Sequence, residues 1–284
     1  MPRTGSDTGG GGSLAGDGWK QVGTADAFVF GVDPQDPETL YGAVAALPSS
    51  RLGKSRDGGV SWTSLPYPGL YGPDLVTVDP RNPRVVYAGG MERTGTDSDC
   101  KVLRSTTGGH TWRCMTGAFE MDGLVIDPAR PATVYLLAGI VFKSQDHGAT
   151  WTSAGRGLPQ GLFATSLALD PTNPRQLYLG VGGETAVYRS IDGARTWSPS
   201  GSGVPSPITS LVVDPRTPST LYAGVRQVGA FVSTDRGATW GTLSGGLPAA
   251  LFTGEILLDP LPPTMLYAVT TAGVYALDLR RGPL

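Results

Sequence analysis

Short apolar runs alternate with turns rich in glycine and proline along the whole chain, and no stretch has convincing helical periodicity. Within each run most successive residues are apolar, as expected for strands buried on both faces between neighbouring sheets. Asp-Pro follows each run directly, and because proline cannot donate a ladder hydrogen bond, it predicts the turn that ends the strand. The pattern predicts an all-β chain, with such strands over residues 76–78, 124–126, 166–169, 210–213 and 256–258.

The same features recur in six units. Tryptophans are spaced 39 to 50 residues apart, and the motif Asp-Pro-x-x-Pro-x-x-x-Tyr runs in step with them. Periods of this length are typical of solenoids, propellers and arrays. Each unit reads as a strand before Asp-Pro, a strand around the tyrosine, a third that ends at a serine and a fourth that begins at the tryptophan, which together make one propeller blade. The tryptophans are Trp19, Trp62, Trp112, Trp151, Trp197 and Trp240, and the motif begins at Asp33, Asp79, Asp127, Asp170, Asp214 and Asp259.

The two ends of the chain complement each other. The sixth unit, which starts at Glu255, has an Asp-Pro and Tyr267 but no tryptophan, whereas Trp19 has no strands before it. We infer that the N-terminal segment supplies the outer strand of the last blade, so that no blade is incomplete. The sequence therefore predicts a single six-bladed β-propeller with four antiparallel strands per blade over residues 17–284, preceded by a flexible tail over residues 1–16.

The turn between the third and fourth strands carries a family resemblance. Residues 55–62, 144–151 and 233–240 match Ser-x-Asp-x-Gly-x-[Ser/Thr]-Trp. This resembles the Asp-box, or BNR, repeat of sialidase-type propellers, which also occurs in sortilin-like receptors, xyloglucan-cleaving enzymes and photosystem II assembly factors. Two copies depart from the motif, with Thr107 in place of the aspartate and Ala194 in place of the glycine. The resemblance covers about residues 17 to 280. It implies the fold, but not a function, because that fold hosts hydrolases, receptors and scaffolds.

We interpret these boxes as structural turns. The aspartate is expected to accept hydrogen bonds from amides of its own turn, the glycine to adopt a positive φ, and the tryptophan to bury apolar surface between blades. The structural aspartates are then Asp57, Asp146, Asp192 and Asp235. Both histidines, His110 and His147, lie in box turns without a second metal ligand at a suitable spacing. We therefore expect neither a metal nor a cofactor.

Charge and cysteine content narrow the partners and the compartment. The net charge of −2 gives no basic footprint for nucleic acid, and no apolar run is long enough to span a membrane. Cys100 and Cys114 flank one hairpin, so that a disulfide, and hence an oxidising compartment, is one interpretation; two reduced, packed thiols are the other. Together with the glycine-rich start, they favour an exported bacterial protein, with a cytoplasmic location left open. We expect a monomer.

Candidate binding residues come from aligning the first strands on Asp-Pro. The positions five and seven residues before each aspartate fall near the axial mouth, the opening around the ring axis, and combine acidic, hydroxyl and aromatic side chains. Such a rim suits a protein, a peptide or a carbohydrate; a solvated channel mouth without a ligand is the alternative. The candidates, including two neighbours of those positions, are Asp26, Tyr71, Asp74, Glu120, Asp122, Phe163, Thr165, Thr209, Phe252 and Glu255.

Three functional classes compete for this mouth. A sialidase-like enzyme would need an arginine cluster, a tyrosine nucleophile paired with a glutamate and an acid/base aspartate; the expected Arg-Ile-Pro motif is absent, and the mouth arginines are Arg51, Arg93 and Arg226. A xyloglucanase-like enzyme could pair Asp74 with Asp122, but that family resembles two larger propellers facing each other across a cleft. A binding module needs only a shaped face. The sequence favours a non-catalytic ligand- or protein-binding propeller, with a glycoside hydrolase as the alternative and no catalytic residue assigned.

Overall fold

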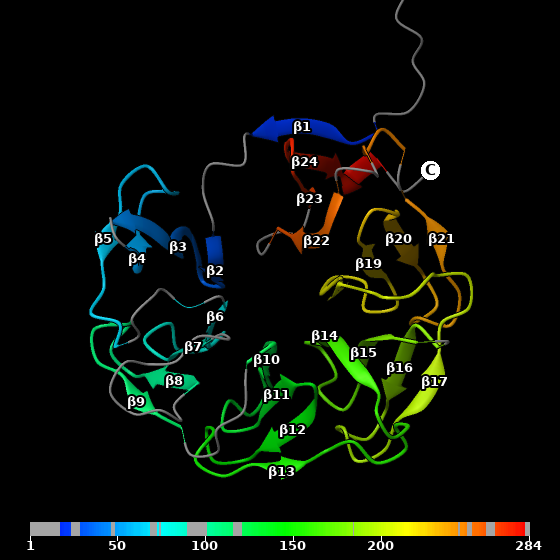
Figure 1. Cartoon of the computed structure of the whole chain (residues 1–284), viewed down its shortest axis with the longest axis horizontal. Coiled ribbons are helices and arrows are strands. Elements are labelled where there is room, and N and C mark those ends of the chain that lie inside the picture. Colours follow the sequence, from blue (N-terminus) through cyan, green and yellow to red (C-terminus); the bar gives the residue numbers. More distant parts are fainter. Residues whose placement is uncertain are drawn as a thin grey trace, which may run out of the picture.

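The computed structural model forms a ring of six four-stranded antiparallel sheets around a central axis (Figure 1). The prediction of an all-β, six-bladed propeller is confirmed. The only helix among the described residues is a 3-10 turn at Leu279–Arg281. The structure describes residues 18–23, 29–46, 49–68, 73, 75–89, 101–115, 121–183, 185–243, 245–248, 252–259 and 265–281.

Blades 1 to 3 are each built from four consecutive strands, the first nearest the axis and the fourth at the rim. Blade 1 contains β2 (Val29–Asp33), β3 (Asp36–Ala46), β4 (Ser49–Ser55) and β5 (Thr63–Ser64). Blade 2 contains β6 (Leu75–Val78), β7 (Val86–Gly89), β8 (Val102–Ser105) and β9 (Arg113–Cys114). Blade 3 contains β10 (Gly123–Ile126), β11 (Val134–Ala138), β12 (Ile140–Ser144) and β13 (Thr152–Ser153).

Blades 4 and 5 repeat this order, whereas blade 6 combines both ends of the chain. Blade 4 contains β14 (Phe163–Leu169), β15 (Leu177–Gly182), β16 (Val187–Ser190) and β17 (Ser198–Ser200). Blade 5 contains β18 (Ser210–Val213), β19 (Leu221–Val225), β20 (Gly229–Ser233) and β21 (Gly241–Thr242). Blade 6 contains β22 (Phe252–Leu258), β23 (Met265–Thr270), β24 (Gly273–Asp278) and, outermost, β1 (Lys20–Gly23).

The ring closes as the sequence predicts, because β1 pairs antiparallel with β24. Trp19, just before β1, is only 5% exposed and packs in the core of blade 6. Its indole Nε1 donates to the carbonyl of Leu243 at 2.6 Å, and its backbone N–H donates to the carbonyl of Gly245 at 3.1 Å. The N-terminal segment is thus held by a ladder, a buried indole and two further hydrogen bonds. The predicted tail over residues 1–16 lies outside the described residues.

Two of the buried motif tyrosines form hydrogen bonds to the next blade. Tyr41, Tyr87, Tyr135 and Tyr178 are the largest side chains that are fully buried. The Tyr87 hydroxyl donates to the carbonyl of His147 at 3.1 Å, which lies in the box turn of the next blade. Tyr135 reaches Gly193 of blade 4 in the same way. Burial, as the main cause, raises the pKa of Tyr87 and Tyr135 to about 12, so these donors stay protonated at any physiological pH.

Each box turn is held by its serine as well as by the residue at the aspartate position. In blade 1 the buried Ser55 hydroxyl donates to Asp57 Oδ1 at 2.7 Å and accepts the N–H of Gly59 at 2.8 Å. Asp57 also accepts the N–H of Ser61 at 2.8 Å. Two successive residues have positive φ in each of these turns, and not all are glycine, since His147, Ala194 and Arg236 also adopt left-handed angles of 61° to 63°. The sequence predicts such angles at the motif glycine alone and does not predict the role of the serine.

These hydrogen bonds make box stability depend on pH. The pKa of Asp57, Asp146 and Asp235 falls to about 2, first because the hydroxyl of Ser61, Thr150 or Thr239 donates to the carboxylate. A depressed folded-state pKa stabilises the fold above the ordinary value of 3.8, and that contribution is lost as the pH falls towards 2. Acid should therefore weaken these turns within that window.

Blade 2 allows a test of this pH dependence, because Thr107 occupies the aspartate position. Its hydroxyl accepts the N–H of Thr111 but carries no titrating charge. Thr107→Asp is expected to raise the free energy of unfolding at pH 7, and the gain should vanish near pH 2. Urea unfolding at both pH values measures it, with Thr107→Asn as a control that has no titrating charge. An equal gain for both variants at both pH values would contradict the charge-based account.

Candidate functional site

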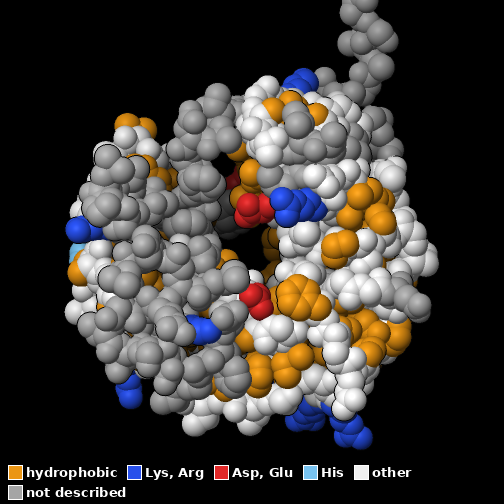
Figure 2. All heavy atoms as spheres, viewed as in Figure 1, with side chains coloured by type: hydrophobic (Ala, Val, Ile, Leu, Met, Phe, Trp, Pro, Cys, Tyr) orange, Lys and Arg blue, Asp and Glu red, His pale blue; other side chains and the backbone are white. Residues whose placement is uncertain are grey.

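The axial mouth opens into a cavity of about 460 Å³ lined by first strands and the residues that precede them. Figure 2 shows the opening at the centre of the ring, with acidic side chains at its rim. First strands start at this face and run to the Asp-Pro turns at the other, so the residues before each strand reach the opening. The lining residues are Leu75, Asp122, Gly123, Leu124, Thr165, Ser166, Leu167, Thr209, Ser210, Gly254, Glu255, Ile256 and Leu257.

Two described carboxylates line the cavity. Asp122 is exposed and accepts the N–H of Gly139 at 2.9 Å through Oδ2, which fixes it against the turn of its own blade. Glu255 also reaches channel solvent, but the surrounding wall desolvates it and raises its pKa above the ordinary value. They belong to blades 3 and 6, which stand on opposite sides of a six-blade ring. The described carboxylates therefore face the channel from two sides instead of forming an adjacent pair.

The predicted threonines have a structural role in this structure. Thr165 Oγ1 lies within hydrogen-bond distance of the carbonyls of Gly180 and Ile208, the latter at the entrance to blade 5. Thr209 Oγ1 does the same toward Gly224 at 3.0 Å and toward Gly254 of blade 6 at 2.7 Å. A hydroxyl has a single proton, which these carbonyls already share. The two threonines tie neighbouring blades together and leave only acceptor lone pairs for a ligand.

Phe163 provides an apolar surface beside Asp122. It begins β14 and is 65% exposed, unusual for a large apolar side chain. The next residue, Ala164, donates its N–H to the carbonyl of Gly139 at 3.1 Å, and the N–H of Gly139 is the one held by Asp122. Ile140, 39% exposed, follows in the same turn. A further cavity of about 280 Å³ adjoins this segment, and its lining includes Leu162 and Tyr188.

Several sequence-predicted residues are not placed. Asp26, Tyr71, Asp74 and Glu120 lie outside the described residues, and Phe252 is described only by its backbone in β22, where it pairs with Thr270. The structure brings together Asp122, Phe163, Thr165, Thr209 and Glu255 at one end of the ring, and the ligand role of all ten stays a prediction.

The mouth arginines do not form a described cluster. Arg93 lies outside the described residues, and Arg51 lies in β4 opposite Val44. Arg226 is exposed, and its backbone packs against Gly254, next to Glu255. Within the described residues, one arginine therefore adjoins the channel lining, beside a carboxylate.

Other sequence expectations concern metal, membrane and cysteine chemistry. Among the described residues, no three His, Cys, Asp or Glu side chains gather as a metal site would need, and no helix is long and apolar enough to cross a membrane. Cys114 lies in β9 and is disulfide-bonded. Cys100, the other cysteine of the sequence, lies outside the described residues, so the pairing itself stays a prediction.

Comparison by sequence finds distant relatives over part of the chain. A xyloglucanase of Paenibacillus sp is 28% identical over 197 residues, which cover 64% of this chain and 17% of that enzyme. The xyloglucanase Xgh74A of Acetivibrio thermocellus is 28% identical over 142 residues, covering 38% of this chain and 17% of the enzyme. The chain thus spans about a sixth of the length of these relatives. No protein-family model matches it.

Comparison by structure supports the fold. The GH74 enzyme of Niastella koreensis superposes with a TM-score of 0.68 at 20% identity, over 88% of this chain and 45% of the enzyme. YCF48 bound to the D1 peptide superposes with a TM-score of 0.55 at 12% identity, over 94% of this chain and 98% of YCF48. The chain is similar in fold both to a GH74 enzyme and to a peptide-bound protein. The fold therefore does not decide the function, which depends on the residues at the axial mouth.

Proposed function

We propose that the chain is a non-catalytic propeller that binds a peptide or protein segment at its axial mouth. The observation that carries this proposal is the exposed Phe163 held next to the Asp122 carboxylate by one glycine, Gly139. An aromatic surface beside a fixed carboxylate suits a segment with an apolar and a basic side chain. Glu255 adds a second negative charge across the opening.

The mouth has the dimensions and composition of a binding site for an extended segment. Its 460 Å³ cavity lies within the usual range for ligand sites, and residues of five blades line it. YCF48, a structural neighbour, is bound to a peptide, which supports a peptide as the ligand of a similar fold. A location outside the cytoplasm is part of the proposal, supported by the disulfide at Cys114.

Peptide selection on the immobilised chain tests this function. We expect enriched peptides that combine a basic and an apolar residue, and binding weakened about tenfold by Phe163→Ala, since a buried aromatic contact is worth at least about 1.4 kcal/mol. Asp122→Asn combined with Glu255→Gln should weaken basic peptides similarly, while asparagine keeps an acceptor for Gly139. Ile191→Ala is the matched control, because Ile191 is 64% exposed in a box turn at the opposite face. Equal weakening by Ile191→Ala, or no enriched peptide, would refute the proposal.

A glycoside hydrolase is the second candidate, favoured by the xyloglucanase relatives and by the raised pKa of Glu255, which a general acid requires. Against it, the described carboxylates stand on opposite blades, and Arg226 is the one described arginine beside the channel, too few to anchor a sialic acid carboxylate. We expect no turnover of xyloglucan or of a fluorogenic sialoside by the purified chain. Reducing-end release that Glu255→Gln abolishes would replace the binding proposal with the enzyme.

A further inference from the structure

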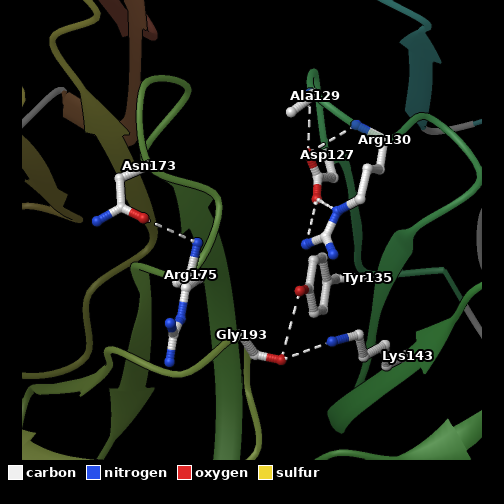
Figure 3. Close-up of polar contacts among 8 residues, drawn as sticks. All are labelled: Asp127, Ala129, Arg130, Tyr135, Lys143, Asn173, Arg175 and Gly193. Atoms are coloured by element: carbon white, nitrogen blue, oxygen red, sulfur yellow. Dashed lines mark hydrogen bonds and ion pairs between the residues drawn. The ribbon is translucent and has the colours of Figure 1, made fainter.

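Another pocket, of about 270 Å³, lies between blades 3 and 4 at the box face, the end of the ring opposite the mouth. The Asp-Pro turns and the box turns meet there, because both end strands that run away from the mouth. Figure 3 shows side chains from the two blades reaching toward the same gap. The lining residues are Arg130, Lys143, Gln145, Arg175, Asp192, Gly193 and Arg195.

Two of the four cations are held in place by the protein. Arg130 donates from Nε to Asp127 Oδ2 at 3.2 Å, and its Nη2 lies 3.1 Å from the same oxygen. Lys143 Nζ donates to the carbonyl of Gly193 at 2.9 Å and lies 5.0 Å from the centre of the Tyr135 ring. Both groups are pre-positioned at the pocket wall before any ligand arrives.

The other two cations are available to a ligand. In the part of the chain that the structure describes, the guanidinium groups of Arg175 and Arg195 have no hydrogen bond or ion pair; only backbone groups of these two residues are engaged. Asp192 also lines the pocket, but its oxygens already accept from the Ser190 and Thr196 hydroxyls and from two backbone amides. Four positive charges thus face two committed carboxylates, those of Asp127 and Asp192.

The positive field acts on the pocket's own lysine. Desolvation lowers the pKa of Lys143, and the nearby charges of Arg130 and Arg195 lower it further, while Asp127 and Asp192 only partly oppose them. An anion bound in the pocket would stabilise the charged form of Lys143, which the neighbouring arginines repel.

Two of the four cations, Arg130 and Arg195, are not required by the repeat, whereas the Lys143 position carries Lys54, Arg104 and Arg189 in other blades. Residues at the Arg130 position of the other described blades are Asp36, Asn82, Asn173 and Thr217, and those at the Arg195 position are Val60, His110, Ala149 and Ala238. The turns form equally well with these neutral or acidic residues. The fold therefore does not explain why Arg130 and Arg195 are added at this junction, and binding a ligand would account for them.

We propose that this pocket binds a doubly charged tetrahedral oxyanion, a phosphate or sulfate group. Arginine suits such a group, because its planar fork donates two parallel hydrogen bonds to two oxygens, and Arg175 and Arg195 have their forks free. Blade 4 supplies both of these arginines, and blade 3 supplies the two anchored cations, Arg130 and Lys143. The site is separate from the axial mouth and does not depend on the function proposed there.

Titration calorimetry of the whole chain with inorganic phosphate and with inorganic sulfate, at constant ionic strength set with chloride, tests the site. We expect saturable binding with one site per chain, weakened about tenfold by Arg175→Gln and again by Arg195→Gln, as expected for loss of charge-assisted hydrogen bonds. Arg113→Gln is the control, since it removes the same charge from the exposed strand β9, in another blade. Circular dichroism melting checks that all variants remain folded.

The two probes also distinguish the sources of the oxyanion. Saturation by phosphate alone assigns the site to a phosphate group, saturation by sulfate alone to a sulfate group, and saturation by both to either. Absence of saturation with both probes, or equal weakening by Arg113→Gln and Arg175→Gln, would show that the cluster is a general surface charge and overturn the proposal.

Discussion

Deletion of residues 1–22 is expected to destabilise the ring severely, because it removes Trp19 and most of β1. Loss of a buried tryptophan alone costs about 3 to 5 kcal/mol, a large share of the roughly 5 to 15 kcal/mol that stabilises a typical domain. The deletion also leaves β24 as an open edge strand without its partner. Thermal unfolding followed by circular dichroism measures the effect.

Deletion of residues 1–14 is the matched control, since it stops before Trp19 and β1. We expect its melting temperature to stay within a few degrees of the full chain, about the shift that 1 kcal/mol produces at this size. Trp19→Ala in the full chain separates the indole from the strand and should fall between the two truncations. If both truncations melt alike, the N-terminal strand does not close the ring in solution.

Gly224→Ala is expected to destabilise the chain by about 3 kcal/mol or more, at the upper end of what overpacking costs. A Cβ at this position of β19 would lie 2.1 Å from the carbonyl oxygen of Gly254 and 2.7 Å from the Ser210 hydroxyl. That same carbonyl accepts hydrogen bonds from Thr209 and Ser210, so a shift that makes room breaks the links between blades 5 and 6. Urea unfolding measures the loss.

Gly241→Ala supplies the same chemical change at a site with space. Nothing lies within 4 Å of a Cβ built at Gly241 in the outer strand β21. We expect no loss and a gain of up to about 1 kcal/mol, since alanine restricts the unfolded chain more than glycine does. Equal effects of the two substitutions would mean that blade 6 does not approach blade 5 as closely as the structure shows.

The architecture was predictable because its determinants are local and repeated. The Asp-Pro turn, the tyrosine eight residues later and the box turn each form within one blade, and the unmatched Trp19 revealed how the ring closes. Six copies of the Asp-Pro turn and the tyrosine, and five of the box turn, outweigh the departures at Thr107 and Ala194. Ala194 even adopts the left-handed angle that glycine was expected to provide.

The site was less predictable because its contacts cross between blades. Thr165 and Thr209 resemble free hydroxyls in the sequence, and only the placement of the neighbouring blade shows that carbonyls occupy them. Gly139 carries no signal of its own, yet it brings Asp122 and Phe163 together. Side-chain partners that belong to another repeat depend on the packing of whole sheets, which no short motif specifies.

The basic pocket shows the same limit. Arg130, Lys143, Arg175 and Arg195 each read as an ordinary surface charge, and they gather only because blade 3 packs against blade 4. A comparison of equivalent turn positions across the six repeats would have singled out Arg130 and Arg195 as departures from their neighbours.

The closing strand has a consequence for how the protein is made. Gln21, near the beginning of the chain, donates its side-chain N–H to the carbonyl of Ala272, 251 residues later. A ribosome therefore delivers the outer strand of blade 6 before blades 1 to 5, and the partners of that strand after them. Blades 1 to 5 can assemble in order, but blade 6 has to wait until β24 has been made. Contacts of such long sequence separation form slowly, so we expect closure of the ring to be a late step of folding.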